Sequence, residues 1–213
     1  VSYHLEKALY AATHGRPGPC WLDVPLNVQA AEIDPDELVH FDVSREGTGS
    51  LPAQEHPEPV SAATVADLFS RVHAAKAPVI LAGGGIRTAH AYDEFRSFIE
   101  KLQIPVCTAW NAHDLMADDD ELYAGRPGTV GTRGGNFVIQ NADLVISLAC
   151  RMNVRQVSYN WESFARGAYL VAVDIDEAEL AKPTLSIDLP IHADIRDFLG
   201  VANRHPERFD RSE

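Results

Sequence analysis

The sequence has few cysteines, no long apolar run and a shortage of basic residues. Its three cysteines, Cys20, Cys107 and Cys150, lack the paired spacing of metal or redox sites, so we expect buried thiols that act as small apolar residues. The nine histidines include no His-Glu-x-x-His pair, which argues against a zinc site. No segment has the length of a membrane span or the pattern of a signal peptide. These absences predict a cytoplasmic protein with no membrane partner.

The charge balance is strongly acidic. Lysine and arginine together number 18, against 31 aspartates and glutamates, which gives a formal net charge of −13. A surface of this sign repels phosphate backbones, so no nucleic-acid partner is expected. An apolar content of 46% over 213 residues is enough for a substantial core. The length suits one large domain, or one domain and a fragment of another.

The most informative segment has the pattern of strand, glycine turn, helix and strand. Pro78–Ala82 is a short continuous apolar run, typical of a strand buried on both faces of a parallel sheet. The three glycines at 83–85 allow the backbone to turn sharply and to approach a ligand closely, since they have no Cβ. Apolar residues at helical spacing follow, namely Tyr92, Phe95, Phe98, Ile99 and Leu102. A second strand pattern, Ile104–Thr108, completes a β-α-β unit.

The glycine turn departs from the dinucleotide fingerprint in two ways. Thr88 stands where a third glycine or alanine is expected, and the second strand ends at Thr108 without the acid that contacts the ribose of NAD. An NAD-dependent dehydrogenase is therefore disfavoured. The turn could bind another nucleotide or could only let the helix pack on the sheet, and both readings remain open.

Composition divides the chain into an N-terminal zone, a polar linker, an alternating zone and a polar tail, at residues 1–33, 34–59, 60–203 and 204–213. The N-terminal zone holds a helical pattern, a glycine-proline turn at 15–19 and an apolar strand pattern at Cys20–Val24. The linker is rich in proline, glutamate, glycine and serine.

The alternating zone predicts the fold. Ser61 is positioned to cap a helix with an apolar stripe of Val65, Leu68, Phe69 and Val72. Beyond the β-α-β unit come a helical pattern, three strand patterns and a closing helix, at 136–141, 143–148, 169–174, 189–192 and 194–201. Repeated alternation predicts an α/β fold, with a doubly wound, mostly parallel six-stranded sheet and helices on both faces.

Five short segments carry a family resemblance. They are PVILAGGG, GTRGGN, NADLVISL, VDIDEAEL and PIHAD, beginning at residues 78, 131, 141, 173 and 190. Their order and spacing resemble the Rossmann-like central domain of thiamine-diphosphate enzymes similar to acetolactate synthase. The segment GRPGPCWLDVP at 15–25 resembles the end of the N-terminal, pyrimidine-binding domain of the same family. The resemblance covers nearly the whole chain.

The resemblance implies that the chemistry lies elsewhere. In this family, a glutamate of the N-terminal domain activates thiamine diphosphate, and a C-terminal motif holds Mg²⁺ and the diphosphate. Neither motif occurs in this sequence, so we expect no catalytic residue and no metal ligand here. The parent enzyme is expected to decarboxylate a 2-keto acid and to join the product to a second carbonyl, as a homodimer or homotetramer. Residues 1–33 would end its N-terminal domain, and residues 60–203 would form its central domain.

The resemblance also implies a ligand for the central domain, either FAD or ADP. The residues that match its binding segments are Gly83, Gly84, Gly85, Thr108, Gly131, Thr132, Arg133, Arg151, Arg155, Asp174 and Asp194. Bare amides at the helix that begins near Gly131, together with Arg133, favour a phosphate. The carboxylate of Asp174 suits ribose hydroxyls, because it only accepts hydrogen bonds.

Several positions depart from the family pattern. Asn153 and Val154 replace two aspartates between the matched arginines, and Val130 replaces a histidine before the Gly-Thr-Arg triplet. Two other readings therefore remain open. The domain could be a structural spacer with an empty crevice, or the chain could be a free-standing nucleotide-binding protein.

Some candidate residues also have a purely structural explanation. Arg151 and Arg155 could pair with surface acids, while Asp174 and Asp176 could end a strand and cap the next helix. Other expectations concern Trp110 and Trp161 as packing residues, His113 as a surface residue and Asp118–Glu121 as a solvated turn. A ring-stacking role for the tryptophans is the alternative.

Overall fold

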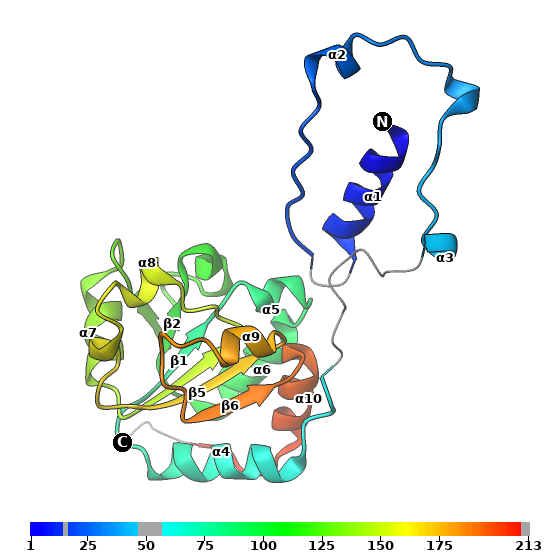
Figure 1. The fold of residues 1–213 in the computed structure, drawn as a ribbon. Coiled ribbons are helices and arrows are strands. Elements are labelled where there is room, and N and C mark those ends of the chain that lie inside the picture. The colour runs from blue at the N-terminus through cyan, green and yellow to red at the C-terminus, as the bar shows by residue number, and fades with distance from the viewer. Residues whose placement is uncertain (15–16, 47–56, 210–213) are drawn as a thin grey trace. The chain divides into compact units, whose positions relative to one another are not determined.

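The structure is a computed structural model that describes residues 1–14, 17–46 and 57–209. The chain forms two units, residues 1–55 and residues 56–213 (Figure 1). Parts of the predicted turn, linker and tail, at 15–16, 47–56 and 210–213, lie outside the described residues.

Unit 1 consists of helices joined by extended segments (Figure 1). Its elements are α1 (Ser2–Thr13), α2 (Leu26–Gln29), the 3-10 helix η1 (Pro35–Glu37) and α3 (Val43–Glu46). The segment before α3 lies against α1, where the ring of Phe41 is 5.8 Å from that of Tyr3 and 5.6 Å from that of Tyr10. The amide of Phe41 also donates to Glu6 Oε2 at 2.8 Å. Part of the predicted linker is therefore held against the first helix.

The predicted strand at Cys20–Val24 is wrong. These residues form no strand, Trp21 is 91% exposed, and Cys20 is exposed instead of buried. A strand needs a neighbour to satisfy its backbone donors and acceptors, and no strand occurs among residues 1–14 and 17–46. Apolar composition alone led to the wrong prediction.

Unit 2 contains a six-stranded sheet with the order β3-β2-β1-β4-β5-β6, in which every pair is parallel. The strands are β1 (Pro78–Ala82), β2 (Val106–Thr108), β3 (Tyr123–Gly125), β4 (Leu144–Leu148), β5 (Tyr169–Asp174) and β6 (Leu189–His192). All residues of β1 and β4 are buried, which explains their continuous apolar sequences. The chain winds away from β1 in one direction and continues from β4 in the other.

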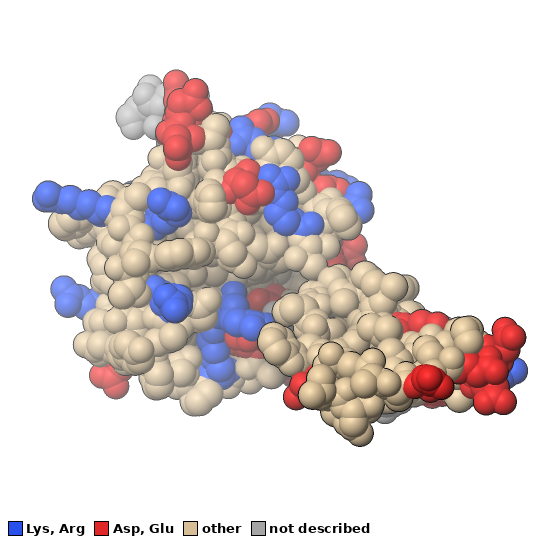
Figure 2. All heavy atoms as spheres, turned by 90° about the horizontal axis from the view of Figure 1, so that it is seen from above, with Lys and Arg blue, Asp and Glu red and all other residues tan. Residues whose placement is uncertain are grey.

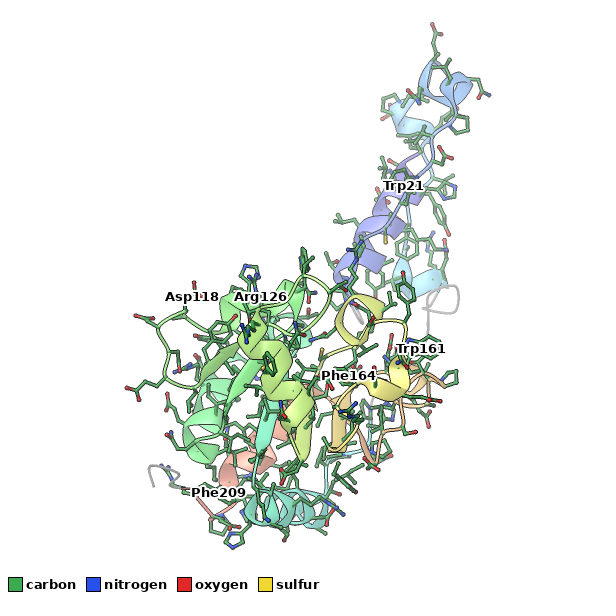
Figure 3. The ribbon with its side chains drawn as sticks, turned by 90° about the vertical axis from the view of Figure 1, so that its left-hand side faces the viewer. Trp21, Asp118, Arg126, Trp161, Phe164 and Phe209 are labelled. Atoms are coloured by element: carbon green, nitrogen blue, oxygen red, sulfur yellow. The ribbon has the colours of Figure 1, made fainter. Side chains whose placement is uncertain are left out.

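Helices cover both faces of this sheet. On one side, α10 (Ile195–Arg204) contacts α4 (Ala62–Ala74) and α6 (Tyr92–Leu102), and α7 (Arg133–Asn141) lies on the other side (Figure 1 and Figure 3). Short helices occupy the connections: α5 (Gly85–Thr88), η2 (Trp110–Leu115), α8 (Val154–Val157), η3 (Trp161–Ser163) and α9 (Glu177–Leu180). The predicted doubly wound α/β fold is confirmed.

Local predictions in unit 2 hold in most places. Ser61 caps α4, with its Oγ accepting from the Thr64 amide at 3.1 Å. The strand that sequence patterns did not locate is β3, whose three residues are too few to show a periodicity. The predicted packing role of two tryptophans is wrong, because Trp110 is 59% and Trp161 41% exposed at the first positions of η2 and η3.

Two absences concern only the described ranges. Within them, no helix combines the length and the apolar character that crossing a membrane requires. Nor do the histidines, cysteines and carboxylates placed there form a group that could hold a metal ion.

A buried lysine holds the end of α10. Lys101 is only 6% exposed, and its ammonium donates to the carbonyls of Ala202, Asn203 and His205, at 2.8 Å for Asn203. These carbonyls belong to the last turn of a helix, where backbone acceptors lack helical partners. The amide of Phe209 donates to the Lys101 carbonyl at 3.0 Å, so the described part of the tail is anchored at the same place.

We expect Lys101→Met to lower the free energy of unfolding by about 2 kcal/mol or more, because it leaves buried carbonyls without a charged donor. Urea unfolding followed by circular dichroism measures the change. Lys76→Met is the matched control, since the Lys76 side chain is exposed. Equal stability of the two variants would contradict a capping role for Lys101.

Candidate functional site

The carboxyl edge of the sheet is closed by hydrogen bonds that continue past the strands. In each of these bonds, the amide of the residue that follows one strand donates to a backbone carbonyl at the end of the neighbouring strand. The pairs are Ala109 to Ala82 at 2.8 Å, Gly83 to Leu148 at 2.9 Å, Ala149 to Val173 at 2.8 Å and Ala193 to Asp174 at 3.0 Å. The loops above this edge therefore start from fixed positions.

The glycine turn lies against the loop after β4. A Cβ on Gly83 would lie 2.1 Å from the Ala149 carbonyl oxygen and 2.4 Å from Cys150 Cα, and one on Gly85 would lie 2.6 Å from Ala149 Cβ. The winding direction reverses between β1 and β4, and open α/β sheets bind ligands at such a point. Two of the three glycines are thus required by a backbone contact at the switch point, whatever binds there.

The third glycine faces the loop after β2. A Cβ on Gly84 would lie 3.0 Å from the side-chain nitrogen of Asn111, which is an exposed residue of η2. A neighbour of this kind can move, so Gly84 is the least constrained of the three. Thr108, at the end of β2, is fully buried, and its hydroxyl oxygen lies 3.3 Å from the hydroxyl oxygen of Tyr123.

A hollow of about 450 Å³, the first hollow, opens between the loops that follow β2, β3 and β4. It is lined by Ala109, Trp110, Asn111, Arg126–Gly131, Asn153, Arg155 and Gln156. The walls are tied together, because the Arg155 carbonyl accepts from the Thr129 amide at 2.9 Å and from its hydroxyl at 2.7 Å. Among the described residues, neither Arg126 nor Arg155 has a carboxylate partner.

The loop before α7 uses several of its own backbone amides in internal hydrogen bonds. Thr132 caps the helix by accepting from the Gly135 amide at 3.1 Å. The amide of Thr132 donates to the Arg126 carbonyl at 2.7 Å, and that of Gly131 donates to the Gly128 carbonyl at 3.0 Å. The amides of Gly131 and Thr132, which precede the helix, are therefore already bonded within the loop.

Arg133 lines a different hollow. Its guanidinium lies 5.4 Å from the ring centre of Phe137 on the outer side of α7. This second hollow, of about 610 Å³, is lined by Arg133, Asn136, Phe137, Gln140, Asn141, Ser163 and Arg166. The structure thus separates Arg133 from Gly131 and Arg155, which line the first hollow.

Other matched residues make structural contacts within the domain. Arg151 Nε lies 2.7 Å from Glu179 Oε1, in line with the surface-pair alternative. Asp174 is 6% exposed and accepts from the Asp176 amide at 3.0 Å. Asp194 is the N-cap of α10, where it accepts from two amides of the first turn at 2.8 and 3.4 Å.

The two cysteines of unit 2, Cys107 and Cys150, are buried thiols of low reactivity. Burial raises the pKa of Cys107 to about 12 and that of Cys150 to about 11, so both remain protonated thiols at neutral pH. The expectation of buried apolar thiols is confirmed for these two residues and fails only for Cys20.

Sequence reasoning did not find Trp110, Asn111 and Arg126 as parts of the site. Arg126 directly follows β3, and a residue after a strand of a parallel sheet is placed at the carboxyl edge. That signal could not be used, because β3 itself was not located. The tryptophan was assigned to packing.

Comparison with known proteins settles the family. Residues 65–201 match the model of the thiamine pyrophosphate enzyme central domain, which is more than half of the chain. The chain belongs to this family. It is 34% identical to the acetolactate synthase large subunit of Lactococcus lactis, over 90% of this chain and 32% of that protein. It is also 33% identical to the acetolactate synthase isozyme 1 large subunit of Escherichia coli, over 92% of this chain and 32% of that protein.

A similar match is found in an archaeon. The chain is 32% identical to the probable acetolactate synthase large subunit of Methanococcus aeolicus, over 90% of this chain and 31% of that protein. The central domain and its flanking unit thus span about a third of the length of these relatives. The predicted family resemblance is confirmed.

We expect Gly83→Ala to destabilise this central domain by about 3 kcal/mol or more, because the new Cβ would collide with the backbone of Ala149 and Cys150. Urea unfolding measures the loss. Gly167→Ala serves as the control, since a Cβ there would meet nothing within 4 Å, and its effect should stay below about 1 kcal/mol. Wild-type stability in Gly83→Ala would show that the close approach at the switch point is not required.

Proposed function

We propose that the chain is the central domain of a thiamine-diphosphate-dependent 2-keto-acid decarboxylase and carboligase, and that its own role is to bind FAD or ADP in the first hollow. Its membership of the family and its similarity to acetolactate synthase large subunits support the first part. The observation that carries the second part is a pair of arginines without carboxylate partners in a hollow beside the switch point.

Arg126 and Arg155 lie in an acidic chain without a carboxylate partner among the described residues. The chain has 31 acids against 18 basic residues, and five arginines of unit 2 pair with carboxylates, namely Arg71, Arg87, Arg96, Arg151 and Arg196. Arg126 and Arg155 instead line a hollow without an acidic lining residue. Guanidinium groups bind phosphates through charge-assisted hydrogen bonds, so this arrangement suits the diphosphate of FAD or ADP.

The residues present fit such a ligand in part. Arg126 and Arg155 would hold the phosphates, and the exposed ring of Trp110 offers a flat apolar surface to a planar base or flavin. The amides of Gly131 and Thr132 do not fit, because both are bonded within their own loop.

The reaction itself belongs to the cofactor and to other parts of the parent protein. Thiamine diphosphate, held with Mg²⁺, supplies the carbanion chemistry when it is bound. This domain contributes placement, as part of a cytoplasmic homodimer or homotetramer. Its buried thiols have pKa values too high for nucleophilic catalysis at neutral pH.

A structural spacer is the second candidate, and a specific observation favours it. The contacts of Gly83, Gly85, Thr132 and Asp194 are all explained by the fold alone. In that case the crevice is empty, and the domain only fixes its neighbours. Ligand occupancy separates the two candidates.

Binding of ADP and FAD to the purified chain is the direct test. We expect Arg126→Ala and Arg155→Ala each to raise the dissociation constant about tenfold, which corresponds to the loss of one charge-assisted contact. Isothermal titration calorimetry measures the affinity. Arg204→Ala, which removes an exposed arginine far along α10, should leave it unchanged. Absence of binding by wild type, together with full-length protein that carries no flavin or adenine nucleotide, would favour the spacer.

The proposed reaction is tested on the full-length parent. Release of CO2 from pyruvate is expected only when thiamine diphosphate and Mg²⁺ are both supplied, whereas the isolated 213-residue chain should release none. A coupled assay for CO2 follows the reaction. Decarboxylation that persists after both cofactors are removed would contradict the assignment. A panel of other 2-keto acids then identifies the substrate.

A further inference from the structure

A side-chain amide in the wall of the first hollow has an unpaired nitrogen. Gln156 belongs to the short helix α8, lines the hollow and is only 9% exposed. Its Nε2 is buried and has no acceptor among the described residues. The other unpaired side-chain atom of this kind in the described ranges, Asn203 Oδ1, lines neither hollow. Because an unsatisfied buried donor costs free energy, the fold leaves at Gln156 a hydrogen bond that an acceptor from outside would complete.

The partner of the amide oxygen fixes which way the side chain is turned. Cys150 Sγ lies 3.3 Å from Gln156 Oε1. Burial raises the pKa of Cys150 to about 11, so the thiol keeps its proton at neutral pH and can donate it to this oxygen. The nitrogen on the other side of the amide then carries two hydrogens and no acceptor. What Gln156 has left to offer a ligand is therefore a donor.

The backbone of Gln156 is held firmly, whereas its side chain is held by a weak bond. The backbone amide donates to the Asn153 carbonyl at 2.9 Å, and a Cβ on Gly128 would lie 3.1 Å from Gln156 Cα, so the loop after β3 packs closely on this turn. The thiol of Cys150, by contrast, is a weak donor. Nε2 is covered in the structure and reaches the hollow by a rotation of the side chain. That rotation breaks only the weak bond to the thiol.

The surroundings of Gln156 select the kind of acceptor. Arg126 and Arg155 line the same hollow, and no acidic residue does. On the face shown in Figure 2, described basic side chains occur in separate places among acidic ones, without a continuous basic patch. An anion is therefore recognised by individual donors inside the hollow and not by a broad positive surface. Phosphate oxygens accept hydrogen bonds from such donors, so they match a nitrogen that only donates.

We propose that Gln156 is a specificity-determining residue of the first hollow, whose Nε2 turns to donate a hydrogen bond to a phosphate oxygen of a bound diphosphate group. Arg126 and Arg155 supply charge to that group, whereas the neutral amide supplies direction. The unsatisfied donor gains a partner only when the ligand carries the diphosphate, so the bond favours ligands with this group. The proposal rests on the nucleotide-binding role proposed above and names a residue that recognises the diphosphate.

Gln156→Met tests this role, because it separates affinity from stability. Methionine has a similar length and lacks the donor, and its thioether can still accept from the Cys150 thiol. We expect the dissociation constants of ADP and of inorganic pyrophosphate each to rise about tenfold, as measured by isothermal titration calorimetry on the 213-residue chain. The urea midpoint of unfolding should equal or exceed that of wild type, because an unpaired buried donor is removed. A glutamine with a purely structural role would give a lower midpoint.

Gln140→Met is the matched control, since Gln140 lines the second hollow, and its affinity for ADP should equal that of wild type. A measurement without substitution accompanies it. In the isotope-labelled wild-type chain, the side-chain NH2 signals of Gln156 should shift when pyrophosphate is added, because its nitrogen gains an acceptor.

The outcomes separate this role from the nucleotide site itself. A wild-type chain that binds neither ADP, FAD nor pyrophosphate would overturn both the site and the role of Gln156. ADP binding that weakens in Arg126→Ala but not in Gln156→Met would overturn the role of Gln156 alone. The same conclusion follows if wild type binds ADP but not pyrophosphate, if the NH2 signals of Gln156 stay in place, or if Gln156→Met lowers the urea midpoint.

Discussion

The arrangement of unit 2 depends on one backbone contact at the point where the winding of the sheet reverses. Gly83, the residue after β1, donates its amide to the Leu148 carbonyl at 2.9 Å. Its Cα lies so close to Ala149 that a Cβ on Gly83 would be 2.1 Å from the Ala149 carbonyl oxygen. Because the contact extends the ladder between β1 and β4, it sets where the loops after both strands begin. The loop after β4 carries Arg155, and the glycine turn after β1 faces Asn111 of the loop after β2; both residues line the first hollow. The glycine turn therefore shapes the site even though its own contacts are structural.

The distribution of charge in unit 2 is a second feature of the site. In a chain with a large excess of acids, five arginines of unit 2 pair with neighbouring carboxylates, and such surface pairs contribute little stability. Among the described residues, the arginines that line the two hollows have no carboxylate partner, and neither do Arg204 and Arg208 outside them. A positive group that is left without a partner in such surroundings is available to an anion from outside. The first hollow, which includes the loop after β4, suits a nucleotide diphosphate.

Much of this could be predicted from the sequence, and the failures have physical causes. The strands at 78–82 and 169–174 were located because buried parallel strands are continuous apolar runs, and the short strand at 189–192 was located although only Ile191 of it is buried. Cys20–Val24 has the same composition but no neighbour to pair with, which a local pattern cannot reveal. β3 is too short to show a pattern, so Arg126 was missed with it. Motif matching brought Gly131 and Arg155 to one hollow, but it could not foresee that Arg133, two residues further on, would point along α7.

We propose the first hollow, and not the second, as the nucleotide site of this domain. Amide chemical shifts of the isotope-labelled chain, recorded during titration with ADP, test this most directly because they report on every loop at once. We expect shifts concentrated at Arg126, Gly128–Gly131 and Arg155, with the outer side of α7 unaffected. Shifts concentrated at Phe137 and Arg166, or no shifts at saturating ADP and FAD, would contradict it.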